Sequence, residues 1–229
     1  FTPKLEEGIA GNGLHVHVEL MKNRKNVMVN DKGDLSENAL KLIGGLCSYA
    51  DTLTAFGNTV PSAYLRLVPN QEAPTRICWS DLNRSAMIRV PLGWSKMSNL
   101  ARRMNIQQKS DFHDPEGRQT VELRSPDGSA FVHLLLAGVC MAAEWGLTQN
   151  KSIEIANKLY TKGNIFNDKA LLKTLPALPG SCVESAKFLV KNRDLYERSS
   201  IFPPSVIDYV AGMLEKENDQ NMNAHLIDL

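Results

Sequence analysis

The chain has 229 residues, of which 26 are Lys or Arg and 25 are Asp or Glu, so its formal net charge is +1. This balance gives no support to a protein whose main task is to bind nucleic acid or a membrane surface. No apolar run reaches the ~18 residues that a membrane-spanning helix needs. Hydrophobic residues make up 43% of the chain, which is ordinary for a soluble globular protein with a sizeable core.

The cysteines lie far apart in the sequence and form no CxxC pair; they are Cys47, Cys78, Cys140 and Cys182. This spacing favours reduced thiols in a cytoplasmic protein over a zinc knuckle or a disulfide framework. No signal peptide is visible. Because the chain begins with Phe1 and not with Met, we expect it to be an excised piece of a longer polypeptide.

Residues 11–20, GNGLHVHVEL, predict a strand that follows a glycine-rich loop. Side chains alternate across a strand, so His15 and His17 share one face while Val16 and Val18 point to the other. Imidazole ligates metals, and glycines let backbone N–H groups approach an anion. An isolated pair of strand histidines is nevertheless more often surface or core than a ligand site.

The rest of the first half reads as one helix and several short strands. Ser36 caps a helix that runs to about Ala55, with apolar residues at helical spacing, and Gly57 and Asn58 end it. Short strands separated by turn signals are expected at 63–68, 75–79, 84–90 and 119–124.

The character of the sequence changes near residue 128. A long apolar segment at 131–147 predicts a mostly buried helix, and shorter helices are expected at 150–162, 168–174, 182–190 and 204–216. The fold class is therefore α+β: a mainly antiparallel sheet in residues 1–128, which carries the candidate site, followed by a helical part in residues 129–229.

The strands of the first half carry more arginine than a core needs. Arg66 lies in one such segment, and Arg84 and Arg89 lie together in another. Glu122 and Arg124 are two residues apart, so their side chains share a face. The spacing of five places Arg84 and Arg89 on opposite faces of an ideal strand. Each residue alone reads more simply as a solvated strand face or a surface ion pair.

The combination says more than any one member. Two histidines, one glutamate and four arginines on neighbouring strands are what metal-assisted phosphoryl transfer needs. A hard divalent cation takes carboxylate oxygen and tolerates imidazole. Arginines neutralise the charge on a transferring phosphoryl group.

Four motifs then resemble the catalytic domain of glutamine synthetases, in the same order. They are GNGLHVHVEL, LTAFGNTVPSAYLRLVPNQEAP, WSDLNRSAMIRVP and VELRSPDGSA, and they extend over roughly residues 1–147. The resemblance implies that the whole chain, 1–229, is part of such a catalytic domain. It also implies that a β-grasp domain and the first catalytic strands, which precede this region in the family, are not included.

The resemblance assigns the nucleotide side of a site. His15 and Glu122 match ligands of the metal ion, Mg²⁺ or Mn²⁺, on the nucleotide-phosphate side. His17 and Arg89 match groups that contact the ATP phosphates. Arg84 matches a catalytic arginine near the transferring phosphoryl group.

The resemblance also assigns the substrate side. Arg66 and Arg124 match the pair that holds glutamate, and Gly11 matches a loop glycine near its amino group. Glu72 matches the catalytic flap glutamate that shields the γ-glutamyl phosphate intermediate and helps to take a proton from ammonium.

The implied activity is that of an ATP-dependent glutamate–ammonia ligase that works as a homo-oligomer in the cytoplasm. Departures from the family pattern, such as Ala10 and Glu19 where Asn and Ser are frequent, lie mainly on the substrate side. They leave open a ligase that joins glutamate to another amine, such as a polyamine. A non-catalytic assembly protein of the family is the third possibility, although His15 and Glu122 are both present. We expect the isolated chain to lack ligase activity.

Overall fold

In the computed structural model, residues 2–6, 9–69, 73–92, 104–107 and 118–220 are described. The strands are β1 Val16–Val18, β2 Met21–Lys22, β3 Lys25–Asn26, β4 Trp79–Asp81, β5 Ile88–Val90 and β6 Val121–Leu123. The α-helices are α1 Glu37–Ser48, α2 Ala50–Gly57, α3 Pro61–Arg66, α5 Val132–Thr148, α6 Ser152–Lys158, α7 Lys169–Thr174, α8 Cys182–Lys191, α9 Asp194–Glu197 and α10 Pro204–Lys216. Short 3₁₀ helices lie at Ile165–Asn167 and Arg198–Ser200.

The main sheet has four short strands in the order β1-β6-β5-β4. β6 pairs antiparallel with both β1 and β5, whereas β5 and β4 are parallel. The predicted α+β class with a mainly antiparallel sheet is therefore confirmed, with one parallel pair at its edge. A separate hairpin joins β2 and β3 through Asn23 and Arg24, which both have positive φ, as a two-residue type I′ turn requires.

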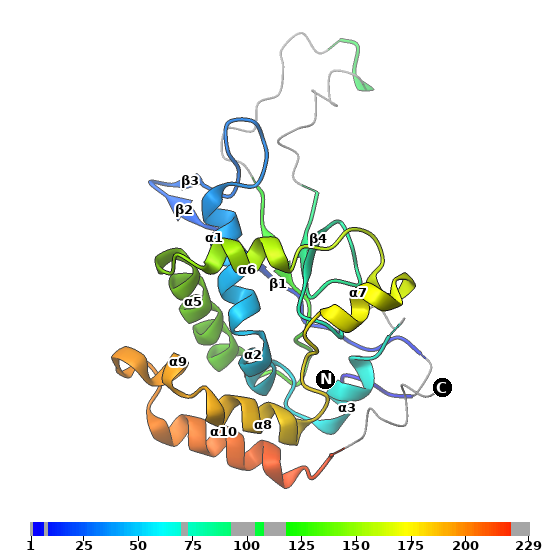
Figure 1. Cartoon of the computed structure of the whole chain (residues 1–229), viewed down its shortest axis with the longest axis vertical. Coiled ribbons are helices and arrows are strands. Elements are labelled where there is room, and N and C mark those ends of the chain that lie inside the picture. Colours follow the sequence, from blue (N-terminus) through cyan, green and yellow to red (C-terminus); the bar gives the residue numbers. More distant parts are fainter. Residues whose placement is uncertain (1, 7–8, 70–72, 93–103, 108–117, 221–229) are drawn as a thin grey trace.

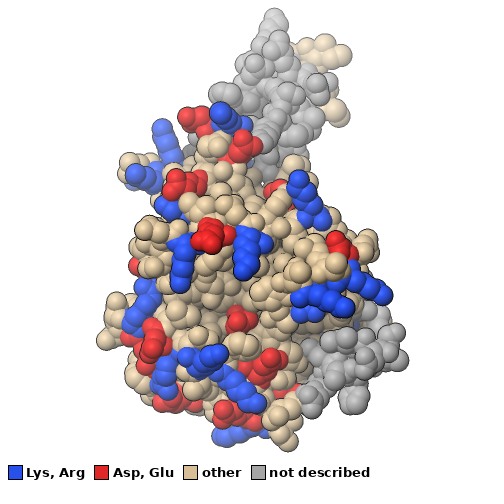
Figure 2. All heavy atoms as spheres, in the orientation of Figure 1, with Lys and Arg blue, Asp and Glu red and all other residues tan. Residues whose placement is uncertain are grey.

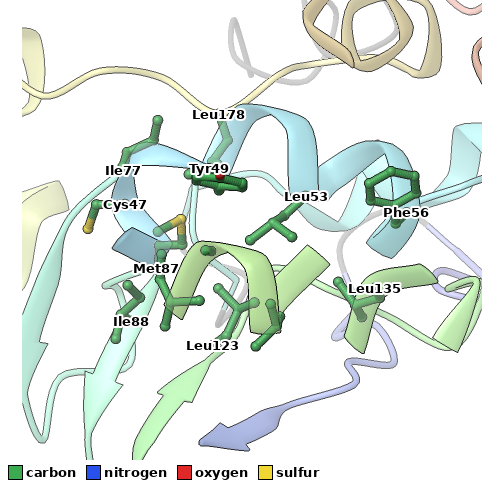
Figure 3. Packing of buried hydrophobic residues seen from close by; sticks show 14 of the residues in the cluster. Cys47, Tyr49, Leu53, Phe56, Ile77, Met87, Ile88, Leu123, Leu135 and Leu178 are labelled. Carbon is green, nitrogen blue, oxygen red and sulfur yellow. The ribbon is translucent and has the colours of Figure 1, made fainter. Parts of the chain in front are cut away.

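The apolar face of the sheet packs under the helices of both halves of the chain. Met87, Ile88 and Leu123 lie below α1 and α2, close to Cys47 and Leu53, as Figure 3 shows. α5 lies beside α1 and α2, and α8 and α10 cover the far side of α2 (Figure 1). One hydrophobic cluster therefore supports the sheet from behind and leaves its other face to polar side chains.

The predicted helix after Ser36 is confirmed in both its start and its end. The Ser36 side chain accepts a hydrogen bond from the Ala39 N–H, which satisfies one of the unpaired donors of the first turn. α1 and α2 are two segments and not one helix, because Tyr49 has φ −100° and ψ 0° between them. α2 ends at Gly57, and Asn58 follows it.

The strand expected at 63–68 is wrong, because residues 61–66 form helix α3. Pro61 occupies the first turn of this helix, where its fixed φ suits the helix and its missing N–H costs nothing. A run of six residues is too short for periodicity to separate a strand from a helix. As a result, Arg66 extends from the end of a helix and not from a strand.

The remaining strands are shorter than expected. Of 75–79 only Trp79 lies in a strand, and of 84–90 only residues 88–90 do, so Arg84 precedes the strand and does not share it with Arg89. The helices expected at 131–147, 168–174, 182–190 and 204–216 are confirmed to within one residue at each end. The helix expected at 150–162 is only half as long, because α6 ends at Lys158 and Tyr160 forms a β-bridge with Trp79. The sequence reading missed the short helix α9 and the β2–β3 hairpin.

Charges of both signs lie on the described part of the face that Figure 2 shows. Figure 2 shows blue and red side chains interspersed on one face, without a large field of one sign on the residues described there. This distribution agrees with the net charge of +1. Among the described residues, no helix has the length and apolar character needed to cross a bilayer.

Candidate functional site

The polar face of the sheet brings three predicted residues into one row across the strands. His17 of β1 is opposite Glu122 of β6, and Glu122 is opposite Arg89 of β5. Residues in register on neighbouring strands have side chains on the same face within contact distance. The flanking residues Val121 and Leu123 point to the core, so the alternation predicted from the sequence separates the site from the core.

Glu122 is the centre of this face, although its side chain is only 1% exposed. His15 Nδ1 lies 2.8 Å from Glu122 Oε1, and Arg89 Nε lies 2.6 Å from Glu122 Oε2. Arg124 Nε lies 3.4 Å from Oε1. The Arg89 contact lacks the alignment of a hydrogen bond, so Oε2 accepts no directed bond from the described residues. The carboxylate is held by charge and retains a lone pair for another ligand.

The charges around His15 favour its neutral form. Burial lowers the pKa of His15 below its ordinary value of 6.5, and the positive charges of Arg124, Arg66 and Arg89 lower it further, against the opposing effect of Glu122. A neutral imidazole is the form that ligates a metal. Three guanidinium groups to one carboxylate also make this region attractive to an anion, such as phosphate or a substrate carboxylate.

Arg66 reaches the same region from the end of α3. Its side chain is 3% exposed, and its Nη1 and Nη2 donate to the carbonyl oxygens of Ser125 and Arg124 at 2.9 and 3.0 Å. The glycines of the first loop lie against it. A Cβ on Gly13 would come within 2.7 Å of Arg66 Nη2, and a Cβ on Gly11 would come within 3.0 Å of Arg66 Cγ. Only glycine leaves this approach open without displacing the arginine.

The other candidates occupy less central positions. Arg84 is exposed in the turn before β5, and its backbone oxygen accepts a hydrogen bond from the Arg124 guanidinium. His17 is exposed, and its Nδ1 lies 3.0 Å from Thr120 Oγ1, a contact that sequence reasoning missed. Glu72 lies outside the described residues.

The donors of His15 and Glu122 fit part of a divalent cation site. The 2.8 Å between His15 Nδ1 and Glu122 Oε1 is close to the roughly 3 Å between adjacent ligands of an octahedral ion with bonds of roughly 2.0–2.1 Å. Glu122 Oε2, which has no directed hydrogen bond, adds an available oxygen. The described residues contain no group of three or more potential His, Cys, Asp or Glu ligands, so these two supply only part of a coordination shell.

The fold and this face together define a class: an α+β domain whose sheet presents arginines, histidines and one buried carboxylate on its polar face. The family model described as glutamine synthetase, catalytic domain, matches residues 1–227. The chain belongs to the glutamine synthetase family.

Individual relatives agree with this assignment. The chain is 35% identical over 212 residues to a glutamine synthetase of Pyrococcus abyssi, covering 91% of this chain and 42% of the relative. It is 32% identical over 237 residues to a glutamine synthetase of Escherichia coli, covering 100% of this chain and 44% of the relative. The chain thus spans less than half the length of these relatives.

A solved structure shares the fold. The cryo-electron-microscopy structure of Plasmodium falciparum glutamine synthetase superposes with a TM-score of 0.69 at 22% sequence identity, covering 99% of this chain and 49% of that one. At this sequence identity the superposition is evidence for the fold alone.

Proposed function

We propose that the protein carrying this chain is an ATP-dependent glutamate–ammonia ligase. In the proposed reaction, ATP phosphorylates the γ-carboxylate of glutamate, and ammonia displaces phosphate to form glutamine. The observation that carries the proposal is the cluster on the polar sheet face, where Glu122 contacts His15, Arg89 and Arg124. The relatives that match the chain are named glutamine synthetases.

On the nucleotide side, His15 and Glu122 would hold Mg²⁺ or Mn²⁺. The ion, when bound, supplies positive charge that neutralises the phosphate oxygens and polarises the phosphoryl group. His17 and Arg89 flank Glu122 across the strands and would contact the ATP phosphates. Arg84 would approach the transferring phosphoryl group from the turn before β5.

On the substrate side, Arg66 and Arg124 would hold the glutamate. Their planar guanidinium groups match the two oxygens of a carboxylate. Gly11 would leave room for the amino group next to Arg66. Glu72 would exclude water from the acyl phosphate and take a proton from ammonium, which must be deprotonated before it can attack.

The proposal extends to the whole protein. The chain, 1–229, would be part of a glutamine synthetase catalytic domain, with the sheet in 1–128 and the helical part in 129–229. The complete protein would act in the cytoplasm as a homo-oligomer. We propose that the isolated chain has no ligase activity, because it covers only 42–44% of the length of its relatives.

A steady-state assay of the longest natural polypeptide that carries the chain tests this function. We expect phosphate release that requires ATP, glutamate and ammonia together, with glutamine as the product. Turnover on a polyamine but not on ammonia would replace the proposal with a γ-glutamyl amide ligase. No ATP turnover with any amine would favour a non-catalytic member of the family.

A further inference from the structure

The orientation of Arg66 depends on the chain segment that follows β6. Its guanidinium donates to the carbonyls of Ser125 and Arg124, and no ion pair joins it to a described carboxylate. These two hydrogen bonds use two of the five N–H donors of an arginine. Two fixed carbonyls therefore set the plane of the guanidinium and leave donors for a ligand. Any residue that positions these carbonyls also positions Arg66.

A buried pair, Asn58 and Asp127, holds this segment in place. Both side chains are 0% exposed. The Asn58 amide donates to the Ser125 carbonyl at 2.9 Å and to Asp127 Oδ2 at 2.8 Å. Ser125 O is thus shared between Asn58 and Arg66. The pair ties the end of α2 to the segment that Arg66 binds.

Asp127 is itself fixed by several further contacts. Its Oδ1 accepts from the backbone N–H of Ser129 at 2.8 Å and from its hydroxyl at 2.6 Å, and its own N–H donates to the Gly57 carbonyl at 3.1 Å. The carboxylate therefore has a single defined position. A buried carboxylate is stable only where hydrogen bonds or a positive charge compensate its loss of hydration, and these donors supply part of that compensation.

The charge of Asp127 acts on Arg66 at a distance. Burial lowers the pKa of the Arg66 guanidinium, and Arg124 lowers it further, whereas Asp127 opposes both. Asp127 thus supports the positive charge of Arg66 without occupying the N–H groups that a substrate would use. Asp127 can therefore compensate the charge of Arg66 while guanidinium N–H groups of Arg66 remain available to a ligand.

We propose that Asp127 and Asn58 are positioning residues, which orient Arg66 for the carboxylate of an amino-acid substrate. The inference rests on the proposed function, since it assigns glutamate to Arg66. Neither side chain is expected to touch the substrate. Their effect passes through the Ser125 carbonyl and the field at Arg66, so it should appear in substrate affinity and not in the use of ATP.

The kinetic test compares two variants of the longest natural polypeptide. Asp127→Asn removes the charge at nearly constant volume, and we expect the KM for glutamate to rise about tenfold while kcat and the KM for ATP change less than about twofold. The control is Thr52→Val, which breaks the buried 2.6 Å hydrogen bond between Thr52 Oγ1 and Tyr196 OH. It should lower the thermal midpoint without changing the ratio of the two KM values. If the ratio of the KM for glutamate to the KM for ATP is the same in Asp127→Asn as in Thr52→Val, the inference is overturned.

A second measurement separates this inference from the proposed function. Hydrogen exchange of the Arg66 guanidinium, followed by nitrogen-15 NMR, reports how firmly its N–H groups are held and needs no activity. We expect exchange to be faster in Asp127→Asn and unchanged in Thr52→Val. Unchanged exchange in Asp127→Asn would refute the positioning role even in an active enzyme. If the wild type does not turn over glutamate but exchange is faster in Asp127→Asn, the proposed function is refuted and the positioning role is retained.

Discussion

Replacing Glu122 by Gln should lower kcat for glutamine formation at least about a hundredfold, as expected when a preorganised charge is lost from a reaction centre. Glu122 is the carboxylate that His15, Arg89 and Arg124 all contact. Gln keeps the shape but removes the negative charge that a divalent cation requires. Steady-state kinetics with ATP, glutamate and ammonia at saturating metal measure the effect.

A matched change elsewhere controls for the general effect of losing a carboxylate. Glu154→Gln alters an exposed position on α6, away from the polar face, and should leave kcat within about twofold, since surface changes of this kind are close to neutral. Wild-type kcat in Glu122→Gln would show that this carboxylate takes no part in the reaction.

Replacing Gly45 by Ala should destabilise the fold by roughly 2–3 kcal/mol, in the upper range for overpacking. A Cβ at Gly45 would lie 2.1 Å from the Ala142 carbonyl oxygen of α5, and one at Gly146 would lie 2.1 Å from the Lys41 carbonyl oxygen of α1. The obstacle in each case is backbone, which cannot rotate away as a side chain can. α1 and α5 would have to separate, and urea unfolding would show a lower midpoint at an unchanged m-value.

Gly212 offers the opposite case within the same chain. It lies inside α10, and a Cβ there would meet nothing within 4 Å. Gly212→Ala should therefore stabilise the protein by about 0.5–1 kcal/mol, because alanine has the better helix propensity and loses less backbone entropy on folding. If Gly45→Ala were as stable as Gly212→Ala, the close approach of α1 to α5 would be wrong.

The sequence predicted best where one local pattern decides the structure. Ser36 begins a helix because its hydroxyl caps an N–H in the first turn, a purely local effect. His15 and His17 share the polar face because strand alternation requires it. The same alternation in residues 121–123 places Glu122 opposite the core, beside His17 and Arg89.

The sequence failed where the local pattern is ambiguous and where contacts distant in the sequence decide the structure. Residues 63–68 carry an ambiguous short pattern, and the proline at position 61 was the one local signal for a helix there. In the sequence, Asn58 is predicted only to end a helix, and no role is predicted for Asp127. Their pairing joins positions 69 residues apart, and no spacing in the sequence announces such a contact.

The roles of the site residues depend on the resemblance to the family, because geometry gives proximity but not chemistry. The structure brings His15, Glu122, Arg89 and Arg124 together. It places Arg66 on the adjoining carbonyls and Arg84 in a neighbouring turn. The division of these groups between ATP and glutamate therefore stays a proposal.

The most direct test of the central claim is a calorimetric titration of the longest natural polypeptide with MgATP, repeated with His15→Ala and with His133→Ala, which alters an exposed histidine of α5. We expect wild-type binding in His133→Ala and binding weakened by at least about tenfold in His15→Ala, as for the loss of a group that tunes a metal site. Equal affinity in His15→Ala and the wild type would contradict a metal–nucleotide site on this face of the sheet.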